Sequence, residues 1–136
     1  MASKGTGRRD ARERSVHLLY EAAQRGVDAQ VVIDEQVVDT DDFTVAVVNG
    51  VTAERAELDS IIERLSDGWA VDRMPTMDRL IVEVGLFELR SRDDVPTAVI
   101  LNEATELANT YSTDDSGRFV NGVLAAAARD LRGVDP

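Results

Sequence analysis

The sequence predicts an all-α protein, a bundle of six or seven helices. Apolar residues recur at three- and four-residue spacing in successive segments, which is the pattern of amphipathic helices. Pro75 and Pro96 stand where helices would begin, a position that tolerates proline because its missing N–H would be unpaired there in any case. There is neither a regular alternation of apolar and polar residues, as strands would need, nor an internal repeat. These three observations together favour a helical bundle.

The first half of the chain predicts three helices. The first ends at Gly26, which serves as its C-terminal cap, and its apolar stripe consists of Val16, Leu19, Tyr20 and Ala23. A short second helix covers residues 29–38. Asp41 or Asp42 then caps a longer helix, whose apolar residues near helical spacing are Val45, Val48, Val51, Leu58, Ile61, Ile62 and Leu65. The valines leave parts of this segment ambiguous with a strand.

The second half predicts three further helices. We expect Trp69, the only tryptophan, to pack across the junction between the halves. The helix after Pro75 belongs in the centre of the bundle because it is apolar on two faces, one with Met77, Leu80, Ile81, Val84 and Phe87 and the other with Val82, Leu86 and Leu89. Pro96 opens the next helix. A final helix runs from near Ser116 to near Leu131, capped by Asp115 or Ser116.

Composition excludes several classes of function. The 136 residues fit a single domain. Cysteine is absent and His17 is the only histidine, so we expect neither a disulfide framework nor a metal site, and His17 is expected to face solvent or cap a helix. Glu83 and Glu103 could be partly buried, as structural carboxylates paired with Arg79 or Arg90. No phosphate-binding glycine loop or catalytic motif occurs, so no enzyme and no cofactor are expected.

No apolar run approaches the roughly 20 residues that a membrane span requires. The polar, glycine-containing start also lacks the apolar core of a secretory signal. We therefore expect a cytoplasmic protein without a membrane partner.

Positive charge is concentrated at the start of the chain. The basic leader, residues 4–14, carries five cations against two anions, whereas the rest of the chain carries ten cations against 24 anions, for a net charge of −11. A polyanion would be repelled by the protein as a whole, so contact with nucleic acid would have to use this patch. Arg8 and Arg12, four residues apart, would share one helix face with Arg9 beside them. The alternative interpretation is a frayed, solvated terminus.

A second candidate segment surrounds Phe119. An aromatic ring next to the guanidinium of Arg118 at a helix start can stack on bases and pair with phosphate, as in the binding of single-stranded RNA. Asp115 belongs to the same turn. The apolar spacing alone is equally compatible with a core phenylalanine beside a solvated arginine, because it does not orient Phe119.

Four ordered motifs resemble the bacterial NusB family of transcription antitermination factors over almost the whole chain. The leader reads R-R-x-A-R-E at residues 8–13 and is followed by Leu18-Leu19-Tyr20. The other three are Asp78-Arg79-Leu80-Ile81 through Phe87-Glu88-Leu89, Asp94-Val95-Pro96 to Asn102-Glu103-Ala104, and Asp114-Asp115-Ser116 to Phe119-Val120-Asn121-Gly122-Val123-Leu124. Their order and separations match those of the family.

The resemblance implies a non-enzymatic RNA-binding protein of two three-helix subdomains, joined near residues 66–75, with residues 1–7 flexible. Such proteins pair with the ribosomal protein NusE, hold boxA RNA and help the RNA polymerase antitermination complex read through terminators in ribosomal RNA operons. By position, the implied RNA contacts are Lys4, Arg8, Arg9, Arg12, Asp115, Arg118 and Phe119. The implied NusE contacts are Tyr20, Asp78 and, more weakly, Asp72.

Two departures from the family pattern are that Asp10 interrupts an arginine run that is often more basic, and that the rest of the chain is unusually acidic. Fewer phosphate contacts imply weaker binding with a shallower salt dependence, and a greater dependence on the partner. The alternative function is a helical protein–protein adapter, or a homodimer without specific RNA binding. An RNA-modifying enzyme is disfavoured because the chain has no room for a second, cofactor-binding domain.

Overall fold

The computed structural model describes residues 4–66 and 71–135, with the backbone alone for residues 4–7. This part of the chain contains helices and no strand, which confirms the all-α prediction. The six α-helices are α1 (Lys4–Arg25), α2 (Ala29–Asp34), α3 (Asp42–Leu65), α4 (Thr76–Ser91), α5 (Thr97–Tyr111) and α6 (Asp114–Arg132), and a short 3-10 helix, η1 (Val71–Arg73), precedes α4.

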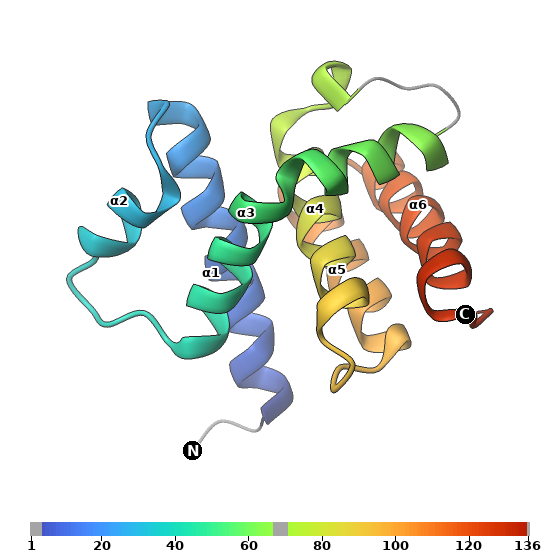
Figure 1. Ribbon diagram of the computed structural model, residues 1–136, viewed down its shortest axis with the longest axis horizontal. Coiled ribbons are helices and arrows are strands. Elements are labelled where there is room, and N and C mark those ends of the chain that lie inside the picture. Colours follow the sequence, from blue (N-terminus) through green and yellow to red (C-terminus); the bar gives the residue numbers. More distant parts are fainter. Residues whose placement is uncertain (1–3, 67–70, 136) are drawn as a thin grey trace.

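The helices form two groups, α1 to α3 and α4 to α6 (Figure 1). Helices α1 and α2 lie on one side, α4, α5 and α6 lie on the other, and α3 runs from the first group across to the second. Helix α4 contacts α1, α3, α5 and α6, and every residue from Leu80 to Leu89 is buried. Its predicted central position is therefore confirmed.

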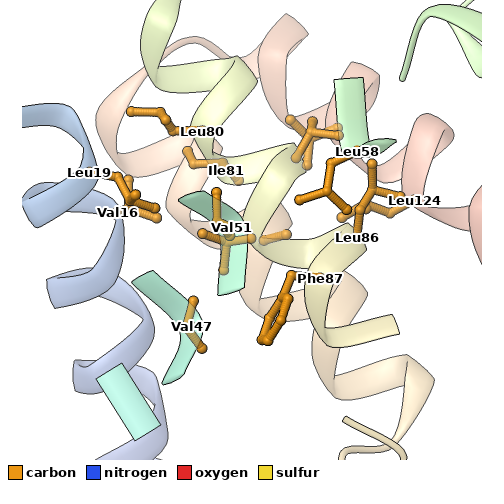
Figure 2. Packing of buried hydrophobic residues seen from close by; sticks show 14 of the residues in the cluster. Val16, Leu19, Val47, Val51, Leu58, Leu80, Ile81, Leu86, Phe87 and Leu124 are labelled. Carbon is orange, nitrogen blue, oxygen red and sulfur yellow. The ribbon is translucent and has the colours of Figure 1, made fainter. Parts of the chain in front are cut away.

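One continuous apolar core joins the two groups (Figure 2). It includes Leu19 from α1, Val51 from α3, Leu86 from α4 and Leu124 from α6. Two glycines permit close helix contacts. A Cβ on Gly50 of α3 would overlap the ring of Phe87 in α4, and a Cβ on Gly85 would lie 2.7 Å from the Leu124 side chain.

Most helix ends follow the predicted signals. Gly26 adopts a φ of 65° after α1, and the Asp41 carboxylate caps α3 by accepting a hydrogen bond from the Thr44 N–H at 3.0 Å. Pro75 and Pro96 immediately precede α4 and α5, as predicted. Helix α1 begins at Lys4, inside the segment expected to be flexible, and the expected packing of Trp69 concerns a residue outside the described part.

Two predicted boundaries are wrong. Helix α2 ends at Asp34 rather than near residue 38. Helix α6 begins at Asp114, and its N-cap is Thr113, whose hydroxyl accepts a hydrogen bond from the Ser116 N–H at 3.1 Å. Asp115 and Ser116 consequently lie in the first turn rather than at the cap, because the hydroxyl three residues earlier already satisfies that N–H. No helix of the described residues is long and apolar enough to cross a membrane.

Candidate nucleic-acid interface

The arginines of the basic leader lie on α1 but differ in environment. Arg9 is exposed and Arg8 is half-buried. Arg12 is buried with 3% exposure, and its guanidinium donates to both carboxylate oxygens of Glu88 in α4 at 2.8 to 3.0 Å. The side chain of Lys4 lies outside the described residues. The leader therefore divides into an anchored arginine and two accessible ones.

An aromatic ring that sequence analysis missed organises this end of the bundle. The Phe43 ring of α3 has three guanidiniums over it, with their central carbons 4.9 Å (Arg8), 5.4 Å (Arg12) and 5.0 Å (Arg92) from its centroid. Cation–π attraction favours this arrangement. The three arginines come from α1 and from the turn after α4, so no local sequence pattern connects them to Phe43.

Carboxylates pair with the accessible arginines. Asp94 accepts hydrogen bonds from Arg8 at 3.1 Å and from Arg92 at 3.2 Å, and these arginines, with Arg92 the stronger influence, hold its pKa below the ordinary value. Arg9 binds both oxygens of Glu103 at 3.0 to 3.2 Å and lies 3.4 Å from Glu106. Glu103 is thus paired as a structural carboxylate, with Arg9 instead of the predicted Arg79 or Arg90.

These pairs border an open hollow of about 360 Å³ between α1 and the start of α5, lined by Arg8, Arg12, Asp94, Val95, Pro96, Val99 and Glu103. The α4–α5 turn on its rim is held from the far end of the chain. Arg132 of α6 donates to the carbonyl oxygens of Glu88, Leu89, Arg92 and Val95 at 2.8 to 3.1 Å and to the Thr97 hydroxyl at 3.0 Å. The site is therefore built on a fixed turn.

The second candidate segment occupies the first two turns of α6. Arg118 is exposed and forms an ion pair with the exposed Asp115 three residues earlier. Phe119 is half-buried and packs against the edge of the core. It also lines an apolar cavity of about 330 Å³, together with Met74, Pro75, Asp78, Asp115 and Ser116. The ring of Phe119 thus combines core contact with a surface on the cavity.

Asp78, a candidate for the protein partner, is buried with 5% exposure. Its Oδ2 accepts a hydrogen bond from the Ser116 hydroxyl at 2.7 Å, which links the start of α4 to the start of α6. Among the described residues, its buried Oδ1 has no hydrogen-bond partner. The packing of α6 against α4 thus covers the carboxylate that the family resemblance implies as a NusE contact. Tyr20 is half-buried and Asp72 is exposed in η1.

Helix α5 separates the two candidate segments. Arg9 contacts Glu103 and Glu106 in its middle, while His17, two turns further along α1, makes an edge-to-face contact with Tyr111 at its end, with ring centroids 4.7 Å apart. His17 faces solvent, as expected. The eight residue steps from Glu103 to Tyr111 span about 12 Å of helix. The leader and the start of α6 therefore lie toward opposite ends of α5.

Glu83 is a fully buried carboxylate that faces the carboxylate of Asp59. It is paired with Arg79, as predicted, at 3.3 Å and also with Arg55 at 3.4 Å. Burial and the neighbouring Asp59 raise its pKa to about 8. No set of three or more side chains in this part of the chain is arranged to hold a metal ion. This cluster fastens α3 to α4 away from the hollow.

Comparisons with known proteins agree along the chain. The NusB family model matches residues 9–129. The transcription antitermination protein NusB of Saccharopolyspora erythraea is 44% identical over 95% of this chain and 96% of its own. T. maritima NusB has a TM-score of 0.81 and 26% identity, covering 100% of this chain and 96% of that one. NusB in a crystal structure with NusE and dsRNA has a TM-score of 0.78 and 25% identity, covering 90% and 96%.

Proposed function

This chain belongs to the NusB family, and we propose that it is a transcription antitermination factor that binds boxA RNA together with the ribosomal protein NusE. The observation that carries the proposal is the family match over residues 9–129, which includes Arg9 and Arg12 of the leader and the start of α6. A solved relative of similar fold was crystallised with NusE and double-stranded RNA.

For the RNA, the leader supplies phosphate contacts and α6 supplies base contacts. Arg8 and Arg9 are accessible guanidiniums, which bind phosphate oxygens through paired N–H groups. Phe119 offers a ring for stacking, with Arg118 beside it for phosphate. Arg12 has a different role. Its guanidinium is already bound by Glu88 of α4, so it anchors the leader to the core.

For the protein partner, we assign the surface around the α4–α6 cavity and α1. The apolar cavity beside Phe119 suits a side chain of a docked protein, and Asp78, with one unpaired oxygen, suits an N–H donor from it. Tyr20 and Asp72 are further contacts with a basic ribosomal protein. The resulting assembly would act without catalysis, by attaching nascent RNA to the RNA polymerase complex during transcription of ribosomal RNA operons.

A titration with a boxA RNA oligomer, with and without NusE, tests this function. We expect binding that is tightened by NusE. Replacing Arg8 and Arg9 together with alanine should weaken it and reduce the slope of log affinity against log salt concentration by about 0.7 for each phosphate that is no longer neutralised.

Arg64→Ala is the control. Arg64, at the end of α3, is an exposed arginine that pairs with one carboxylate, Asp130 of α6. It should leave both affinity and salt slope unchanged. Equal behaviour of the control and the leader variant would overturn the assignment of the leader. Absence of any preference for boxA over a scrambled oligomer would favour an adapter or homodimer instead.

A further inference from the structure

The leader arginines are engaged before any RNA arrives, and the geometry points to a carboxylate latch. We propose that Asp94, Glu103 and Glu106, here called the latch, occupy the positions that RNA phosphates take, so that RNA binds by displacing them. This inference rests on the proposed function and assigns it a regulation. It also adds Arg92 to the RNA-binding residues.

Asp94 is the first part of the latch. Its carboxylate lies between two guanidiniums, 3.1 Å from Arg8 and 3.2 Å from Arg92, and both guanidiniums rest on the Phe43 ring. A phosphate group has the same charge sign and similar acceptor oxygens, so it can replace the carboxylate without moving either arginine. Displacing Asp94 therefore exposes a preformed pair of cations, Arg8 and Arg92. Arg92 lies outside the leader and would add a phosphate contact to those of the leader.

Glu103 and Glu106 are the second part. Glu103 binds Arg9 Nε and Nη2 through both of its oxygens, and the Glu106 carboxylate lies 3.4 Å from the same Nη2 atom. The two glutamates sit on one face of α5, which the fold presents directly to the leader. The Nε and Nη2 donors of Arg9 are thereby engaged although its side chain is 55% exposed.

Exposure distinguishes a displaceable pair from a fixed one. The side chains of Arg8, Arg9, Asp94 and Glu106 are 37 to 61% exposed and that of Glu103 is 14% exposed, whereas Arg12 and Glu88 are 3% and 1% exposed. Exposed pairs contribute little stability, so exchange for phosphate costs little, while separating a buried pair costs much more. The open hollow beside the leader is lined by Arg8, Asp94 and Glu103, which gives phosphate a path to three pairs. These pairs are Arg8–Asp94, Arg92–Asp94 and Arg9–Glu103.

The test compares two variants with the same change in charge. We expect the latch variant, Asp94→Asn with Glu103→Gln, to bind boxA RNA about three- to tenfold more tightly than wild type does, since each pair with an exposed arginine opposes exchange by roughly 1.4- to fivefold. The control variant is Asp10→Asn with Asp93→Asn. It removes two exposed carboxylates from the same region that form no ion pair among the described residues.

The gain of the latch variant must exceed that of the control variant, and it must shrink when Arg8 and Arg9 are also alanine. Equal gains would show that general charge repulsion explains the effect, and the latch would be overturned while leader binding stands. If alanine at Arg8 and Arg9 leaves RNA affinity unchanged, the leader assignment and the latch both fall. Arg92→Ala, made in the latch variant, should in turn weaken binding at least twofold, and no change would remove Arg92 from the site.

Discussion

The two ends of α5 carry binding surfaces of opposite character. The leader end consists of guanidiniums on an aromatic ring, paired with exposed carboxylates. The α4–α6 end consists of an apolar cavity with a single buried carboxylate, Asp78. The first kind of surface exchanges one ionic partner for another and is sensitive to salt, whereas the second gains free energy from burying apolar area and depends on shape. One helix thus separates a mainly electrostatic task from a mainly apolar one.

Substitution of Arg12 should have the largest effect, because this residue belongs to the basic leader in sequence but is buried in the structure. Arg12→Ala leaves Glu88 buried without its partner and should lower the free energy of unfolding by about 3–5 kcal/mol. Urea denaturation measures this decrease. Arg9→Ala, which removes its exposed neighbour in the same motif, should cost far less stability, and equal decreases would refute the division of the leader.

Asp78 tests the other end with the next largest effect. Asp78→Lys places an unpaired cation against Ser116 and the cavity and should cost about 2–3 kcal/mol of stability. Asp78→Asn keeps the shape and the bond to Ser116, so it should fold nearly normally while binding NusE less tightly. Thermal unfolding and NusE titration separate the two effects. Normal NusE binding by a folded Asp78→Asn protein would make Asp78 purely structural.

Phe119 sharpens the contrast in salt dependence. Phe119→Ala should weaken RNA binding by roughly 1–3 kcal/mol without changing the salt slope, since a stacking contact releases no counterion. Phe119→Leu is the control for packing, because it keeps apolar volume against the core but offers no ring. If the leucine variant binds RNA like wild type, Phe119 serves the core rather than the bases.

Glu83 lies outside both surfaces, and its predicted effect depends on pH. Its pKa of about 8 in the folded protein exceeds the ordinary 4.5, so between these pH values the folded chain holds a proton that the unfolded chain has released. Stability should therefore fall as pH rises from about 5 to 8, by at least about 1 kcal/mol relative to Glu83→Gln. Urea unfolding of both proteins across this range measures it, and parallel pH profiles would contradict the raised pKa.

Local signals in the sequence predicted the fold well and the site only in part. Helix number, the caps at Gly26 and Asp41, and the central place of α4 follow from spacing and capping chemistry within a few residues. The environment of each arginine in the leader does not follow from such local signals. Whether Arg12 is buried depends on Glu88, 76 residues away, and whether Arg8 meets a ring depends on Phe43 in another helix. Such pairs form only when the helices pack together, so no periodic pattern in the sequence indicates them.

The contacts of Arg132 also bear on the order in which the protein folds. This arginine ties down the α4–α5 turn from 35 to 44 residues further along the chain. Long-range contacts form late because closing large loops costs entropy. The turn that carries Arg92 and Asp94 should therefore acquire its final geometry only after α6 has been synthesised and has docked. On a translating ribosome, the basic end of the bundle would mature last even though its leader emerges first.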